Sequence, residues 1–134
     1  MDVEITQNES PRLITVKLRG RFTLEGCRAA AVSVADVKDP LCPMLIDDRE
    51  VDFGGVTPDL LMEVDAIFSA HARVFSYSKM AALVLPEAVP VAEQWSRLSN
   101  SGSSAKVAIF IDEREAVDWL TEPGSPTFSE EWEG

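Results

Sequence analysis

The stretch "VAIFIDEREAVDWL", residues 107–120, joins an apolar run to an amphipathic pattern through a short acidic junction. Asp112 and Glu115 have the spacing of a capping box, in which the first side chain accepts from a backbone N–H three residues on and the second side chain returns to the cap's own N–H. Apolar residues then recur at helical spacing, at Ala116, Val117 and Leu120. The junction therefore predicts a buried strand that turns into a helix, with its acids serving as a cap and not as a catalytic signature.

Outward from this junction, apolar runs and helical patterns alternate along most of the chain. Runs typical of strands buried on both faces lie at 43–47, 79–85 and 106–111. Patterns of helical period lie at 24–37, from Thr57 to about Phe75, from Pro90 onward, and at 113–121. Strands that alternate with helices in this way predict a largely parallel sheet.

The first part of the chain has a different pattern. A short strand is predicted at 3–6, and "RLITVKLRGRF" at 12–22 alternates between polar and apolar residues, which is typical of a strand with one wet face. These two strands can pair as an antiparallel ribbon at the sheet edge. The predicted fold is therefore α/β, a single domain with a mixed, mostly parallel sheet of about five strands and four helices in the order β-β-α-β-α-β-α-β-α.

The chain has 134 residues, which suits one domain of the usual size of about 100 to 150 residues. We expect this domain to span residues 1–122. The segment "SNSGSS" at 99–104 reads as a turn inside it. Residues 123–134 are acidic, contain proline and glycine and lack periodicity, so we expect a flexible C-terminal tail.

The chain is strongly acidic. Its 23 acidic and 12 basic residues give a formal net charge of −11. Such a charge repels phosphate backbones and anionic lipid headgroups and favours basic partners. Nucleic acid is therefore excluded as an expected ligand.

The sequence also indicates a compartment. Its apolar runs are far shorter than the roughly 20 residues of a membrane span, and "MDVEITQNES" lacks the basic and apolar regions of a signal peptide. Cys27 and Cys42 form no CxxC pair, which indicates two reduced structural cysteines. We expect a cytoplasmic protein with no membrane span.

Three stretches together resemble the STAS superfamily (sulfate transporter and anti-sigma-factor antagonist), and most closely its SpoIIAA-like branch of bacterial proteins of the STAS/SEC14 type. They are "ITVKLRGRFT", "MLIDDREVDFGGVTPD" and the closing "VAIFIDEREAVDWL". The resemblance covers about residues 3 to 121 and implies a non-catalytic regulatory or binding domain without a cofactor.

The chain departs from this family at one functional position. STAS regulators that switch by phosphorylation carry an Asp-Ser pair at the start of the helix after the central strand, where this chain has "GGVTPD" with Thr57 as the one hydroxyl. Thr57 is fully explained as an N-cap, with Pro58 and Asp59 as typical first-turn residues. Phosphorylation of Thr57 stays open as the alternative.

Few residues of the chain could form a catalytic or metal-binding group. Asp47, Asp48 and Asp112 each follow or end a strand and could gather at one end of the sheet, as a site for a hard cation or as a phosphoacceptor site. A phosphoacceptor site would also need a lysine after the final strand, and "FIDERE" contains none. The single histidine, His71, lies in an apolar helical row and reads as a packing residue. No GxSxG elbow or phosphate-binding glycine loop occurs in the sequence, so no enzyme activity is predicted.

Two binding hypotheses remain. The first is a regulatory module that docks a protein partner through the loop and helix start near 53–60, with these contact residues: Phe53, Gly54, Gly55, Val56, Thr57 and Asp59. The second is a carrier or sensor of a small apolar ligand or lipid, with this pocket: Leu61, Phe68, Phe75 and Trp95. The partners left open are a protein, favoured to be basic, an apolar ligand, and a second copy of the chain in a homodimer.

Overall fold

The computed structural model describes residues 1–75, 77–102 and 106–122, so the predicted tail at 123–134 lies outside the described residues. Its elements are β1 (Asp2–Glu9), β2 (Arg12–Arg21), α1 (Leu24–Val37), β3 (Met44–Asp52), α2 (Pro58–Ala70), α3 (Ala72–Phe75), β4 (Lys79–Leu83), the 3₁₀ helix η1 (Pro86–Ala88), α4 (Val89–Gly102), β5 (Lys106–Phe110) and α5 (Glu113–Leu120). In the part of the chain so described, no helix has the length and apolarity needed to cross a membrane.

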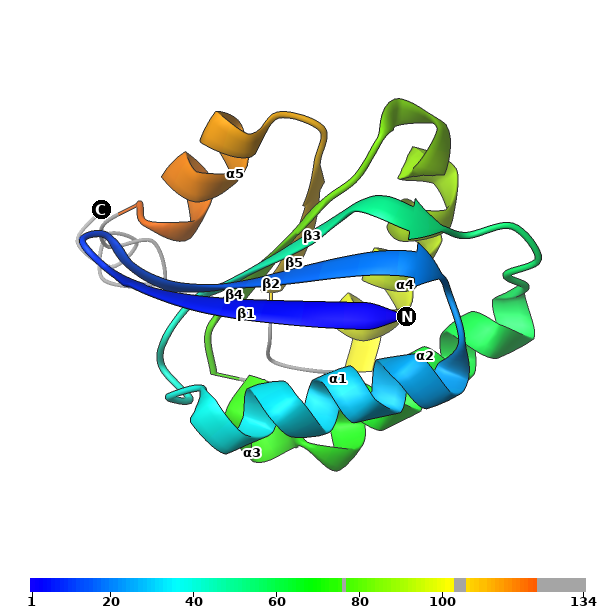
Figure 1. Ribbon diagram of the computed structural model, residues 1–134, viewed down its shortest axis with the longest axis horizontal. Helices are drawn as coiled ribbons and strands as arrows, with labels where there is room; N and C mark the ends of the chain where they lie inside the picture. Colours follow the sequence, from blue (N-terminus) through cyan, green and yellow to red (C-terminus); the bar gives the residue numbers. More distant parts are fainter. Residues whose placement is uncertain (76, 103–105, 123–134) are drawn as a thin grey trace.

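The strands form one mixed sheet in the order β1-β2-β3-β4-β5 (Figure 1). β1 pairs with β2 antiparallel, and β2, β3, β4 and β5 pair in parallel. The predicted antiparallel ribbon at the edge of a largely parallel sheet is thereby confirmed. The predicted order of elements is also confirmed, with the short α3 and η1 as additions.

The two faces of the sheet are covered unequally. α1, α2 and α4 pack on one face, over a large apolar cluster that includes Ile46 and Ala82. α5 packs on the other face, over a smaller cluster that includes Leu45 and Ala81. Figure 1 shows α1 and α2 side by side below the sheet and α5 above it. Because α5 covers the β3–β5 side, the β1–β2 part of its face stays open to solvent.

The alternation predicted for β2 is present. Ile14 and Val16 are buried under the three-helix layer, while Lys17 and Arg19 lie half-buried on the opposite face. Leu13 falls on the same side of the strand by alternation, which predicts a wet position, but it is buried in the smaller cluster with α5 residues. The wet face of β2 therefore begins after Leu13, because α5 reaches that end of the strand.

Several predicted boundaries differ from the structure for tertiary reasons. β3 was expected to end at Asp47, but it continues to Asp52 because its second half pairs with β2 beyond a shift in register. The helix expected to run to Phe75 ends at His71, whose backbone leaves the helical region with φ −115° and ψ 36°. β1 covers 2–9 and not 3–6, since it pairs with β2 along its whole length.

The turn predicted at 99–104 is wrong for its first four residues, which belong to α4. Asn100 explains the difference. Its side chain accepts from Val107 N at 3.0 Å and donates to Val107 O at 3.0 Å, so it pairs with β5 as a neighbouring strand would. A polar side chain that finds such a partner no longer competes with the backbone of its own helix.

The two predicted N-caps are confirmed. The Asp112 carboxylate accepts from the backbone N–H of Arg114 at 2.8 Å and of Glu115 at 3.2 Å. The Thr57 hydroxyl accepts from Leu60 N at 3.2 Å. The returning bond of the capping box, from the Glu115 side chain to the Asp112 N–H, does not occur among the hydrogen bonds of the described residues. Asp112 therefore caps α5 by itself.

Candidate functional site

An apolar cavity of about 80 Å³ lies between the sheet and the three-helix layer. Its lining comes from β2, β3, β4, α1, α2, α4 and the loops before α1 and α2: Leu18, Phe22, Cys27, Ile46, Asp48, Phe53, Val56, Leu61, Val64, Phe68, Ala82, Val91, Ala92 and Trp95. A water molecule needs about 10 to 15 Å³ by this kind of measure, so the space is several times larger than one water. The interior of this protein therefore has room for a small ligand.

Local sequence patterns bring these walls together. Ile46 and Asp48 are two positions apart on β3 and share one face of the sheet. Leu61, Val64 and Phe68 recur at helical spacing on α2 and face the same space. The cavity therefore lies between the inward-facing side chains of β3 and those of α2, which do not fill the volume between the two elements.

The aromatic wall of the cavity is well packed. The Phe68 ring lies 5.4 Å from the Trp95 ring and 5.0 Å from the Phe75 ring, measured between centroids. Trp95 is only 8% exposed, and its indole Nε1 has no hydrogen-bond partner among the described residues. A buried donor without a partner is unusual in a native interior. The indole N–H of Trp95 is thus a buried donor beside the cavity that lacks a hydrogen-bond acceptor among the described residues.

Asp48 is the one ionisable carboxyl in this lining. Removal from water raises the pKa of Asp48 from its ordinary value of 3.8 to about 7, with the neighbouring charge of Asp47 acting in the same direction. No described residue donates a hydrogen bond to the Asp48 side chain or forms an ion pair with it. Burial also raises the pKa of the Cys27 thiol, to about 11.

A second cavity of about 230 Å³ adjoins the first. Both are lined by Asp48, Phe53 and Val91, and the second is completed by residues of β3, the following loop and η1: Val51, Gly54, Leu85, Glu87 and Ala88. Glu87 is exposed, so this outer cavity is wetter than the inner one. Asp48 therefore lies where the inner cavity meets an outer cavity that has a second carboxyl, that of Glu87, in its lining.

The loop before α2 forms the rim of both cavities. Phe53 and Val56 are half-buried and line the inner cavity, while Gly54, Gly55 and Thr57 are exposed. Gly55 has φ +86°, a conformation that residues with a Cβ rarely adopt. The glycine therefore lets the loop turn back so that Val56 can face inward.

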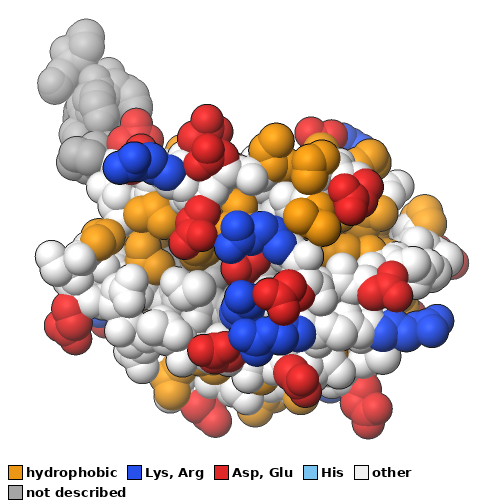
Figure 2. All heavy atoms as spheres, turned by 45° about the horizontal axis from the view of Figure 1, so that its top comes forward, with side chains coloured by type: hydrophobic (Ala, Val, Ile, Leu, Met, Phe, Trp, Pro, Cys, Tyr) orange, Lys and Arg blue, Asp and Glu red, His pale blue; other side chains and the backbone are white. Residues whose placement is uncertain are grey.

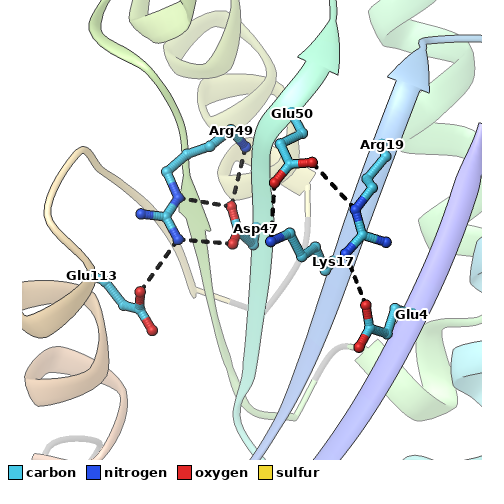
Figure 3. Close-up of polar contacts among 7 residues, drawn as sticks. All are labelled: Glu4, Lys17, Arg19, Asp47, Arg49, Glu50 and Glu113. Atoms are coloured by element: carbon cyan, nitrogen blue, oxygen red, sulfur yellow. Dashed lines mark hydrogen bonds and ion pairs between the residues drawn. The ribbon is translucent and has the colours of Figure 1, made fainter.

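Asp47 lies on the opposite face of the sheet and has its own partner. Arg49 donates to it from Nε at 3.0 Å and from NH2 at 3.0 Å, and Arg49 also reaches Glu113 of α5 at 3.3 Å (Figure 3). Burial opposes the ionisation of Asp47, but the hydrogen bonds and charge of Arg49 outweigh it and hold the pKa of Asp47 below its ordinary value. This carboxylate is thus neutralised within the protein.

The part of this face that α5 leaves open, over β1, β2 and the second half of β3, carries a chain of ion pairs. Glu50 pairs with Lys17 at 3.1 Å and with Arg19 at 3.2 Å, and Arg19 pairs with Glu4 at 3.0 Å (Figure 3). Figure 2 shows basic and acidic side chains interleaved over the side that carries α5, with hydrophobic side chains grouped at the upper right and at the left of the view. Interleaved charges form a solvated surface, not a single-sign patch.

The hypothesis of a carboxylate cluster does not agree with this geometry. Asp47 and Asp48 point to opposite faces of the sheet. The carboxylate of Asp112 accepts the hydrogen bonds that cap α5. Among the residues that the structure describes, no group of three His, Cys, Asp or Glu side chains is placed to hold a metal ion. The three acids therefore act separately.

Comparison with known proteins bears on the fold. No family model and no curated protein matches the chain. A crystal structure of an uncharacterised DUF3478-family protein from Shewanella loihica PV-4, described as having a SpoIIAA-like fold, matches with a TM-score of 0.59 and 23% sequence identity, over 89% of this chain and 92% of that one. The fold is SpoIIAA-like. At this identity the likeness shows the fold alone, so the function has to be argued from the residues.

The SpoIIAA-like fold places three of the four predicted pocket residues on the cavity: Leu61, Phe68 and Trp95. Phe75 does not line it, because the Phe75 ring lies behind Phe68. Two residues predicted for partner docking, Phe53 and Val56, also line the cavity. The two binding hypotheses therefore involve one continuous region of the molecule.

Two features of this fold were not anticipated. The sequence suggests Asp48 only as part of a metal or phosphoacceptor cluster, although its position two residues after the buried Ile46 indicates an inward side chain. Lys38 is 5% exposed and donates to Val74 O at 2.9 Å and to Ser78 Oγ at 3.0 Å. Burial lowers the pKa of Lys38 to about 8. Lys38 also donates to the nearby carbonyl groups of Asp39 and Pro40, but its burial depends on Val74 and Ser78, which lie far along the chain and leave no local sequence signal.

His71 has the packing role that was expected. Its ring is half-buried and lies edge-on to Phe75, with centroids 6.3 Å apart. Its backbone N–H bonds to the carbonyl groups of Phe68 and Ser69, which ends α2. The residue thus serves the helix end and the core.

Proposed function

We propose that this protein is a non-catalytic carrier or sensor that binds a small apolar ligand in the cavity between the sheet and the three-helix layer. The observation that carries the proposal is the cavity itself, an apolar space beside a carboxyl that has no hydrogen-bond or ion-pair partner among the described residues. Native interiors are close-packed and contain few spaces larger than a water molecule. An apolar space of this kind takes up apolar molecules readily.

The chemistry of the lining supports binding over catalysis. Acid–base and nucleophilic catalysis need a second group within hydrogen-bond reach of the first. Here Asp48 is the one carboxyl in the lining, and the raised pKa of Cys27 keeps its thiol protonated and therefore weakly nucleophilic. The site is suited to hold a molecule without transforming it.

Calorimetric titration with the neutral probes 1-hexanol and benzene tests this function. The wild-type protein should bind at least one of them, and Ala82→Leu should abolish binding because the larger side chain enters the cavity. Ala29→Leu, the same change on the exposed side of α1, is the matched control and should bind as the wild type does. Absence of binding to the wild type, or equal binding to Ala82→Leu, would overturn the proposal.

Native mass spectrometry of the purified protein gives a second readout. A resident hydrophobic ligand should appear as added mass on the wild type and on Ala29→Leu. The added mass should be missing from Ala82→Leu. Retention of the same mass by Ala82→Leu would place the ligand outside the cavity.

A second candidate function is docking of a protein partner at the rim of the cavity. The exposed residues of the loop and of the start of α2 adjoin Met62, which is 59% exposed one turn into the helix. An exposed methionine can adapt to a partner surface. The net charge of −11 favours a basic partner.

Thr57→Asp separates a cap from a phosphorylation switch at this rim. Aspartate is a good N-cap and its charge suits a helix start, so the melting temperature should not change. Affinity for a partner recovered by pull-down should also be unchanged if Thr57 only caps α2. A tenfold loss of affinity, about 1.4 kcal/mol, at equal stability would instead favour the switch.

The cytoplasm is the compartment that we propose. Cys27 and Cys42 are both free and buried. Unpaired cysteines are typical of proteins from reducing compartments.

A further inference from the structure

We propose that the ligand carries a single protonated amine on a short apolar body, with the body in the inner cavity and the ammonium group between Asp48 and Glu87. This inference rests on the proposed function, because it names the class of molecule that the same cavity would accept. The ligand class follows from the charges, the sizes and the connection of the two cavities.

The charge of the lining selects the head group. Among the residues that the structure describes, no lysine, arginine or histidine lines either cavity, and the ionisable side chains that do so are two carboxyls and one thiol. Asp48 has no partner among the described residues, and a carboxylate partly removed from water is costly unless a cation or donor meets it. An ammonium group supplies both the positive charge and the donors, whereas a carboxylate or phosphate would be repelled.

The position of Asp48 fixes where such a head would lie. Asp48 lines both cavities, so a molecule whose body fills the apolar space ends with its head at the boundary. Glu87 lines the outer cavity and forms no ion pair with a described residue. The Phe53 ring lines both cavities too and can add a cation–π contact to the head. Two groups at the boundary, Asp48 and Phe53, and a third in the outer cavity, Glu87, therefore favour a cation.

The volume limits the body of the ligand. A space of about 80 Å³ suits a short alkyl chain or one aromatic ring, given the roughly 10 to 15 Å³ that one water requires by the same kind of measure. The long acyl chains of a bilayer lipid need much more room. The ligand is therefore a small amine and not a membrane lipid.

The acidity of the whole molecule supports the same choice. With a net charge of −11, the protein attracts cations and repels anions in solution. The open surface over β1, β2 and the second half of β3 is neutralised by its own ion pairs, including those of Glu50 with Lys17 and Arg19. The carboxyls at the cavities have no such neutralisation by a described residue.

The test compares three probes of equal chain length at pH 8, hexylammonium, 1-hexanol and hexanoate, by calorimetric titration. The wild type should bind hexylammonium at least tenfold more tightly than 1-hexanol, and hexanoate more weakly than both. Asp48→Asn should lower the affinity for hexylammonium at least tenfold and leave that for 1-hexanol unchanged. Glu87→Gln should lower the affinity for hexylammonium about threefold.

Glu93→Gln is the matched control, because it removes one acid from an exposed position of α4 that lines neither cavity. It should bind all three probes as the wild type does. If Glu93→Gln weakens hexylammonium binding as much as Asp48→Asn, net charge and not the site selects the amine, and the inference fails.

The remaining outcomes distinguish the inference from the function on which it rests. Equal binding of hexylammonium and 1-hexanol by the wild type would leave cavity binding intact and overturn the preference for an amine. Absence of binding of all three probes would overturn the proposed function as well. Unchanged amine affinity in Asp48→Asn would place the head group elsewhere and end the inference.

Discussion

Asp47 and Asp48 are consecutive residues of β3 with opposite electrostatic environments. Asp47 lies on the α5 face, where Arg49 holds it with two side-chain hydrogen bonds and keeps the pKa of its carboxyl below the ordinary value. Asp48 lies on the other face beside the apolar cavity, where removal from water raises the pKa of its carboxyl to about 7. Two neighbouring positions of one strand therefore differ: Asp47 has an ion-pair partner, and Asp48 has none among the described residues.

The difference teaches that the two faces of this sheet have different tasks. The α5 face satisfies its charges within the protein and has no cavity lined by Asp47 among those described. The three-helix face contains an unfilled cavity and the carboxyl of Asp48, which has no partner among the described residues. Unsatisfied groups of this kind are costly to stability, and natural proteins tend to keep them where they bind or react.

The largest expected effect is that of Asp47→Asn, which should lower the free energy of unfolding by about 3 kcal/mol at neutral pH. It removes the charged acceptor of two Arg49 hydrogen bonds, at a carboxylate whose side chain is only 8% exposed, and leaves the half-buried Arg49 without a full partner. Urea denaturation measures the change. Glu113→Gln, which breaks only the exposed pair at 3.3 Å, is the control and should stay within about 0.5 kcal/mol. Equal small effects from both variants would show that the two faces do not differ in this way.

Filling the two faces with the same side chain should also give unequal costs. Ala81 is 0% exposed and packs in the α5 cluster, so Ala81→Leu should destabilise the protein by about 2 kcal/mol through overpacking. Ala82 lines the cavity, so Ala82→Leu should cost less than about 1 kcal/mol. Thermal melts of both variants measure the difference. An equal cost would mean that the cavity gives no room to a larger side chain.

Asp48→Asn should stabilise the protein, by about 1 to 2 kcal/mol at pH 8. The folded pKa of Asp48, about 7, lies above its ordinary value of 3.8, so its contribution to stability is fully present below 3.8 and is lost as the pH rises through 7. Asparagine does not ionise, so the variant keeps its stability as the pH rises. Its advantage over the wild type in free energy of unfolding should therefore disappear at pH 4. Denaturant midpoints at the two pH values test this sign, with Glu93→Gln as a control that should show no such pH-dependent gain. A gain that is equal at both pH values would contradict the raised pKa.

The smallest effect concerns the junction that attaches α5 to the sheet. Asp112→Ala should cost about 1 kcal/mol, because two backbone N–H groups of α5 lose their acceptor. Glu115→Ala should cost less than about 0.5 kcal/mol, since no returning bond to the Asp112 N–H is present. The two denaturant midpoints are compared directly. A midpoint that rises in Asp112→Ala would contradict the capping role.

Part of the candidate site could be predicted from periodicity. Leu61, Phe68 and Trp95 were expected to face a common apolar space, because helical spacing shows which side chains share a face. Phe75 was expected with them, but α2 ends at His71 and the Phe75 ring lies behind Phe68. The break depends on packing against distant residues, which a local pattern does not contain.

The sequence by itself determined the order of elements, the pairing of an antiparallel edge with parallel strands, and the caps at Thr57 and Asp112. All of these depend on local signals, namely periodicity and the preferences of residues at helix starts. Only the tertiary structure decided that Arg49 neutralises Asp47, that Asp48 has no such partner, and that a cavity lies beside it. The physical reason is that burial, desolvation and unfilled volume arise where distant segments meet, so their values are set by the packing of the whole fold.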